Sequence, residues 1–133
     1  MRLHSQRLEI VGADEWLEID AGIAVWTLTS VELASAVARL VRERSIAEGA
    51  AHEAEVRIDQ LFASCHTIVD VEAVKMHARR LLRVHPLRAA GALQLGAAWE
   101  WALGRPSDRV FHTFDARLGV AARREGFFVV PEP

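Results

Sequence analysis

HPLRAAGALQLGAAWEWA, residues 85–102, is the stretch that decides the fold of this chain. Pro86 disfavours helical geometry for the residue before it, so we expect a helix to begin after this break, at about Arg88. Nearly every side chain from there to Ala102 is apolar or small, which is typical of a helix buried on most of its circumference. Gly91 is the exception, because a glycine inside a helix costs about 1 kcal/mol relative to alanine.

Short apolar, β-branched runs alternate with longer helical patterns along the rest of the chain. The expected strands are 23–28, 66–71, 110–114 and 127–130. The expected amphipathic helices are 31–44, 46–63, 72–84 and 115–125, and a further short helix is expected at 13–20. Parallel strands need crossover connections, so this order predicts an α/β fold, a three-layer α/β/α sandwich with a parallel sheet.

Polar residues mark the starts of several expected helices. Two pairs match the capping box, in which a hydroxyl and a carboxylate three residues on satisfy free amides reciprocally: Thr29 with Glu32, and Ser45 with Glu48. Two aspartates are placed as N-caps, Asp70 and Asp115. The expected inner stripes are Val31, Ala34, Val37, Ala38 and Val41 in the first long helix, and Val74, Ala78, Leu81 and Leu82 in the third.

The size of the chain, 133 residues of which 51% are hydrophobic, predicts a single domain over residues 1–133. Residues 1–12 form an atypical N-terminal segment, since RLEIV suits only a short exposed strand. A net charge of −2 argues against a generally basic surface, but Arg-rich segments leave room for local basic patches. One cysteine, Cys65, excludes an internal disulfide and favours a small core residue over a nucleophile. No apolar run reaches about 20 residues, so we expect a cytoplasmic protein without a membrane span.

Two carboxylates follow expected strands: Glu32 comes just after 23–28, and Asp115 comes directly after 110–114. Chemistry in open α/β sheets gathers at the carboxyl ends of the strands. Two carboxylates there can hold a hard divalent cation. Each acid also has a purely structural explanation as a helix-capping residue, and the spacing leaves both interpretations open.

Other residue types offer less chemistry. No histidine pair has the HExxH spacing of a zinc helix, and the chain has no Gly-rich phosphate loop, GxSxG elbow or CxxC pair. His112 precedes Asp115 by three residues, so the two should face opposite sides of the strand. We expect His85 to be a turn residue, and Trp101 either to pack in the fold or to form part of an interface.

Three motifs occur in this order: TLTSVELASAVARLVRER (27–44), HPLRAAGALQLGAAWEWA (85–102) and HTFDARLGVAARREGFFVVPE (112–132). Together they resemble the VapC-type PIN-domain ribonucleases, toxins of bacterial toxin–antitoxin pairs. The resemblance runs from about residue 13 to the C-terminus. It implies an endoribonuclease that depends on Mg²⁺ or Mn²⁺, is inhibited by a cognate VapB-like antitoxin and forms a homodimer.

The resemblance also implies a cluster of four acids. Glu32 and Asp115 match two of them as catalytic and metal-binding residues, and Thr113 matches a supporting polar position. The family acid expected in the helix at 85–102 is replaced here by Gly91. The family acid of the first strand has His4 as its nearest counterpart, in a segment that looks truncated or replaced.

We therefore expect a VapC-like toxin whose RNA cleavage is impaired, since fewer carboxylates bind a divalent ion less tightly. The alternative is a catalytically inactive PIN-like binding module that retains the antitoxin or dimer surface. A third possibility is an α/β domain in which the two acids only cap helices.

Overall fold

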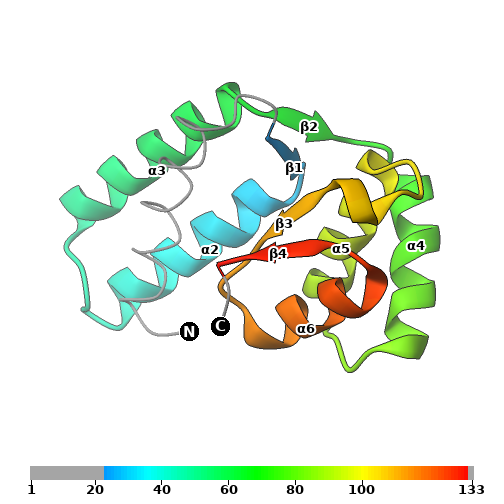
Figure 1. Cartoon of the computed structure of the whole chain (residues 1–133). Coiled ribbons are helices and arrows are strands. Elements are labelled where there is room, and N and C mark those ends of the chain that lie inside the picture. Colours follow the sequence, from blue (N-terminus) through cyan, green and yellow to red (C-terminus); the bar gives the residue numbers. More distant parts are fainter. Residues whose placement is uncertain (1–22, 132–133) are drawn as a thin grey trace. The chain divides into compact units, whose positions relative to one another are not determined.

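The computed structural model describes residues 23–131, which fall into two compact units that divide between Thr67 and Ile68 (Figure 1). Helices and strands alternate in both units, which confirms the mixed α/β class. Between residues 23 and 131 no helix is long and apolar enough to cross a membrane. The expected strand within 1–12, the expected helix at 13–20 and His4 lie outside the described residues.

The first unit is built on a strand, two long helices and a second strand. These are β1 (Ala24–Trp26), α2 (Thr29–Arg42), α3 (Glu48–Ala63) and β2 (His66–Ile68). β1 and β2 are hydrogen-bonded neighbours, and the amide of His66 donates to the carbonyl of Ile23 (2.9 Å). α2 and α3 pack against each other (Figure 1). Both strands and both helices lie where the sequence predicts them.

Neither predicted capping box forms, and the chain leading into each helix explains why. α2 begins at Thr29 itself, because the amide of Glu32 already donates to the carbonyl of Leu28 (3.1 Å). Thr29 is therefore helical and cannot be the cap in front of the helix. Ser45 belongs to the exit from α2, where its amide donates to the carbonyl of Leu40 (2.9 Å). α3 begins a few residues later without a side-chain cap.

The buried stripe of α2 differs from the prediction, whereas the stripe of α4 (Val71–Val84) matches it except at one residue. In α2 the buried side chains are Val37 and Leu40, whereas Val31 is 63% exposed. Leu40 lies outside the predicted stripe, so the sequence pattern indicated the helical period but not the face. In α4, Val74, Ala78 and Leu81 are buried as predicted, and Leu82 alone of the predicted stripe is exposed. Successive residues point about 100° apart on a helix, so one narrow interface takes only one of the two leucines.

The second unit surrounds one pair of parallel strands with helices. After α4 come α5 (Ala89–Trp101), a short 3₁₀ helix η1 (Pro106–Asp108), β3 (Val110–His112), α6 (Ala116–Glu125) and β4 (Phe128–Val130). β3 and β4 pair in parallel, with Phe111 opposite Val129, and α6 is the crossover between them. This confirms the parallel strand–helix–strand connection that the sequence predicts for 110–130.

α5 is the buried helix that the sequence predicts. Its buried residues are Ala92, Leu95, Gly96 and Ala97, and α4 packs along it. The core of the unit is a cluster of apolar side chains from α4, α5, β3, α6 and β4: Leu81, Leu95, Ala102, Phe111, Leu118, Ala121, Ala122, Phe127 and Val129. Burial of this apolar surface is the main favourable term holding the strands to the helices.

Three helix ends in this unit follow the sequence signals. Asp70 accepts the amide of Ala73 (3.1 Å) and caps α4, and Asp115 caps α6. Gly126 ends α6 at φ 104°, in the left-handed region that favours glycine. These predictions succeed because each depends only on residues within one turn of the helix end.

Candidate functional site around the start of helix α6

Asp115 lies at the N-terminus of α6, just beyond the end of β3. Its Oδ1 accepts the amides of Arg117 (3.0 Å) and Leu118 (3.2 Å). The hydroxyl of Thr113 accepts the amide of Asp115 itself (3.0 Å). Two predicted site residues thus meet in one turn, which fixes the carboxylate at the end of the strand and leaves Oδ2 for a further ligand.

Gly91 lies in the first turn of α5, beside this same turn of α6. A Cβ atom at Gly91 would lie 3.6 Å from Cδ1 of Leu118 and 4.0 Å from Cδ2 of Leu87, which is ordinary van der Waals contact. Leu118 is also the residue whose amide Asp115 accepts. Position 91 therefore has room for a Cβ, which would lie against the side chain of Leu118.

The other predicted acid positions lie elsewhere in the chain. Glu32 is half-buried in the first turn of α2, directly beyond β1, and belongs to the first unit. His4 lies outside the described residues. Within the second unit, the structure thus joins Asp115 to Thr113 and places Gly91 against the side chain of Leu118.

This turn offers few oxygen ligands for a hard divalent ion. Among residues 23–131, no three His, Cys, Asp or Glu side chains within one unit lie close enough together to hold a metal ion. Asp115 offers a carboxylate oxygen, which is the ligand type that Mg²⁺ and Mn²⁺ prefer, and Mg²⁺ is usually held by only one or two carboxylates. Gly91 contributes no ligand. The ligand that Asp115 offers therefore has the right chemistry for Mg²⁺ or Mn²⁺, but the site carries little negative charge.

A buried polar cluster that the sequence did not indicate lies at the far end of α6. The Glu125 carboxylate is 9% exposed and accepts from the Arg80 guanidinium, from His85 Nε2 (2.7 Å) and from the Trp99 indole N–H (2.9 Å). His85 follows α4 in a turn, as predicted, but its ring is buried against this acid. The cluster ties α4, α5 and α6 together.

Burial alone would raise the pKa of Glu125, but hydrogen bonds from Arg80 and His85, the charge of Arg80 and the Trp99 indole outweigh it and lower the pKa. The carboxylate is therefore held in its charged form. Glu125 lies 26 to 45 residues from its partners in sequence, so no local spacing could reveal the cluster. Its role in the structure is to join helices, and it lies away from the Asp115 turn.

The single cysteine is structural in its surroundings. The Cys65 thiol donates to the carbonyl of Leu61 (3.2 Å) at the end of α3, and partial burial raises its pKa. A raised pKa keeps the thiol protonated, which disfavours a nucleophilic role.

Trp101 is half-buried. The Cζ atom of the Arg109 guanidinium lies over the Trp101 ring, 4.5 Å from the ring centroid.

The mixed α/β fold, with Asp115 fixed beyond a parallel strand of the second unit, is consistent with the PIN-like class that the three sequence motifs predict. Two curated relatives place it more narrowly: Ribonuclease VapC45 of Mycobacterium tuberculosis (strain CDC 1551 / Oshkosh) and Ribonuclease VapC49 of Mycobacterium tuberculosis (strain ATCC 25618 / H37Rv). Each is 30% identical over 116 residues, covering 87% of this chain and 78% of the relative.

The chain therefore belongs to the VapC ribonuclease family, as its three motifs predict. No family model matches the chain, and no solved structure matches it.

Proposed function

We propose that this chain is the toxin component of a VapC-type toxin–antitoxin pair, an endoribonuclease acting on cytoplasmic RNA. Glu32 and Asp115 are its catalytic and metal-binding acids, and Thr113 supports the second of them. The observation that carries the proposal is the turn in which Thr113 fixes Asp115, with Gly91, one of the two family acid positions that are replaced here, next to the Leu118 side chain of the same turn.

The residues of this turn have distinct roles in the proposal. Asp115 uses Oδ1 to cap α6, so its carboxylate cannot move away from the start of the helix without losing two amide hydrogen bonds. A divalent ion, Mg²⁺ or Mn²⁺, supplies the positive charge that stabilises phosphoryl oxygens and activates the attacking water. Thr113 keeps the backbone of Asp115 in place.

Gly91 makes the site weak in this proposal. A carboxylate at position 91 would add charge beside Asp115, and the affinity of oxygen sites for divalent ions depends on the number of charged ligands. The space for such a side chain is already present. We therefore expect slow cleavage and loose metal binding rather than a collapsed site.

Restoring the acid tests the proposal. G91D should tighten Mn²⁺ binding about tenfold, equivalent to about 1.4 kcal/mol, because a second carboxylate joins Asp115. That gain should add about 5 °C to the rise in melting temperature caused by saturating Mn²⁺. The same variant should cleave a structured RNA faster in Mn²⁺.

Matched variants separate charge from packing. G91N has nearly the same shape without the charge and should not gain Mn²⁺ affinity. G49D makes the same substitution on α3, where nothing lies within 4 Å of an added Cβ, and should also show no gain. E32Q in the wild-type background should abolish cleavage, and cleavage that survives this substitution would contradict the site assignment.

A catalytically inactive binding module is the second candidate, and the single carboxylate contributed by the second unit favours it. Such a module would keep the surfaces for a VapB-like antitoxin and for a second copy of the chain. It predicts that the wild-type melting temperature does not respond to Mn²⁺ and that RNA stays intact. Recovery of cleavage in G91D would then identify a scaffold that lacks only one ligand.

A further inference from the structure

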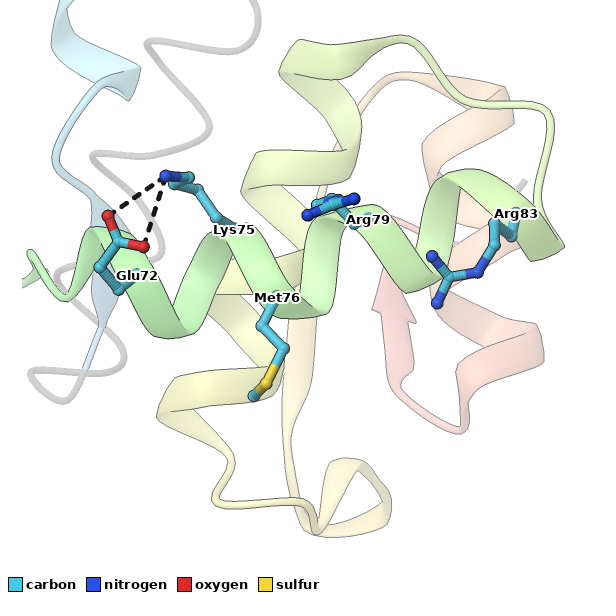
Figure 2. A pocket seen from close by; sticks show the side chains of 5 residues that line it. All are labelled: Glu72, Lys75, Met76, Arg79 and Arg83. Atoms are coloured by element: carbon cyan, nitrogen blue, oxygen red, sulfur yellow. Dashed lines mark hydrogen bonds and ion pairs between the residues drawn. The ribbon is translucent and has the colours of Figure 1, made fainter.

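One side of α4 carries a row of cations that the core and the Asp115 turn do not use (Figure 2). Lys75, Arg79 and Arg83 follow each other at intervals of four residues, and all three are exposed. Together with Glu72 and Met76 they line a hollow of about 320 Å³. We refer to Lys75, Arg79 and Arg83 as the α4 basic face.

The charges of this face are only partly neutralised. The Lys75 ammonium donates to both carboxylate oxygens of Glu72, at 3.2 and 3.3 Å. Over residues 23–131, neither Arg79 nor Arg83 forms an ion pair with an acid, whereas their neighbour Arg80 is bound to Glu125. The guanidinium groups of Arg79 and Arg83 are thus exposed, and no acid among residues 23–131 neutralises their charge.

The spacing of the row suits a chain of negative charges. A helix rises 1.5 Å per residue, so consecutive members lie about 6 Å apart along the axis and the row extends over about 12 Å. Long, flexible side chains at such intervals can each reach one of several consecutive phosphates in an extended strand. The planar guanidinium group also matches phosphate oxygens in a bidentate geometry.

We propose that the α4 basic face binds the phosphodiester backbone of single-stranded RNA. The proposal rests on the proposed function, since it assigns the ribonuclease a surface that holds its substrate. The chain as a whole has a net charge of −2, so attraction for RNA has to come from a local concentration of cations such as this one.

The composition of the face favours RNA over a protein. Of the five described residues that line the hollow, Met76 alone is apolar, whereas the centre of a protein interface is depleted of charge and built on apolar or aromatic anchors. A symmetric contact between two copies of this face would set the same cations against each other. The phosphodiester backbone of RNA needs no apolar anchor and carries the opposite charge.

Neutralising the two free arginines tests the proposal. Glutamine is also a good helix former, so R79Q/R83Q should keep α4 intact. Binding of a fluorescein-labelled polyuridylate strand is followed by anisotropy in EDTA, over a series of salt concentrations. We expect several-fold weaker binding at low salt, and a plot of log K against log salt whose slope is smaller by about 1.4, or 0.7 for each lost phosphate contact.

The control R105Q/R124Q makes the same change of net charge at two exposed arginines elsewhere in the second unit. It should leave the salt slope close to that of the wild type. A loss of similar size in this control would show that RNA responds to net charge alone and would overturn the assignment to α4.

Removing the acid at the edge of the face should have the opposite effect. E72Q frees the Lys75 ammonium from its partner, so RNA should bind more tightly and the salt slope should grow by about 0.7. E48Q removes the corresponding first-turn acid of α3 and should produce no such gain. Damage to the fold cannot produce tighter binding, so this variant separates a binding role from a structural one.

Failures of the two proposals give different results. If wild type binds RNA and R79Q/R83Q binds it equally well with the same slope, the α4 assignment is wrong and the ribonuclease proposal stands. If wild type neither binds RNA in EDTA nor cleaves it in Mn²⁺, both are wrong. If R79Q/R83Q changes only the sedimentation coefficient, the face contacts another copy of the chain, which also overturns RNA binding there.

Discussion

Gly91 and Gly96 lie on the same helix, but the structure gives them opposite roles. The sequence singled out Gly91 as a costly residue inside α5, yet the helix begins at Ala89, so Gly91 lies in its first turn with room beside it. At Gly96 an added Cβ would lie 2.9 Å from the carbonyl oxygen of Val74 and 3.1 Å from the amide nitrogen of Ala78. Glycine is required at 96 by packing, whereas at 91 an added Cβ would make only ordinary contacts.

This contrast predicts the effect of a single methyl group. G96A should lower the free energy of unfolding by about 1 to 3 kcal/mol, because the new Cβ meets the backbone of α4, which cannot move aside as a flexible side chain would. Urea denaturation at neutral pH measures the change. The control G49A adds the same methyl group on α3 in open space and should be neutral or stabilising by up to about 1 kcal/mol. Equal stability of G96A and wild type would contradict the close approach of α4 and α5.

At the scale of whole elements, helix starts show what a local pattern can and cannot predict. Asp70 and Asp115 were predicted as caps and are caps, since each needs only the amides of the following turn. Thr29 and Ser45 also match a capping pattern, but the strand or turn before them determines where the helix begins. A capping pattern therefore predicts that a helix starts nearby more securely than it predicts which residue caps it.

The cap of α6 allows the structural and chemical roles of Asp115 to be separated. D115A should destabilise the chain by about 1 kcal/mol, because two amides lose their acceptor, whereas D115N keeps an acceptor oxygen and should cost less. Both should lose any Mn²⁺-dependent rise in melting temperature, since the charge is gone. Thermal unfolding with Mn²⁺ and with EDTA makes the comparison. If D115N keeps the full Mn²⁺ response, Asp115 is a cap and not a metal ligand.

At the scale of the molecule, the sequence predicted the fold class and the order of the elements. The rule that parallel strands need a crossover uses only this order, and the pairing of β3 with β4 across α6 follows it. The face that α2 buries and the partners of Glu125 depend on residues far apart in the chain, which no period or motif encodes, whereas the period alone predicted most of the buried face of α4. The single-domain assignment for 1–133 and the assignment of the site residues stay predictions.

The Glu125 cluster predicts how the stability of the chain changes with pH. The pKa of Glu125 is lower in the folded chain than its ordinary value, so its contribution is present above about pH 4.3 and is lost as pH falls from there through the lowered pKa. E125Q should unfold more easily at neutral pH by about 2 kcal/mol, because Arg80 and His85 lose a charged acceptor.

The difference between E125Q and wild type should shrink as the pH is lowered from about 5 to 3, since the wild type loses the same charge there. Urea denaturation across this range measures it. The control E53Q changes an exposed acid of α3 and should show no comparable loss at neutral pH. A difference that stays constant down to the lowest pH would mean that the charge of Glu125 contributes nothing.

The open space at Gly91 also bears on how this chain can evolve. Glycine and aspartate codons can differ by one base, and a Cβ at this position meets its neighbours at ordinary contact distances. A reversion would therefore need no second mutation to make room for the side chain. Where the codon for Gly91 is GGC or GGT, one base change would place an aspartate there, and its Cβ would meet no backbone clash of the kind that an added Cβ meets at Gly96.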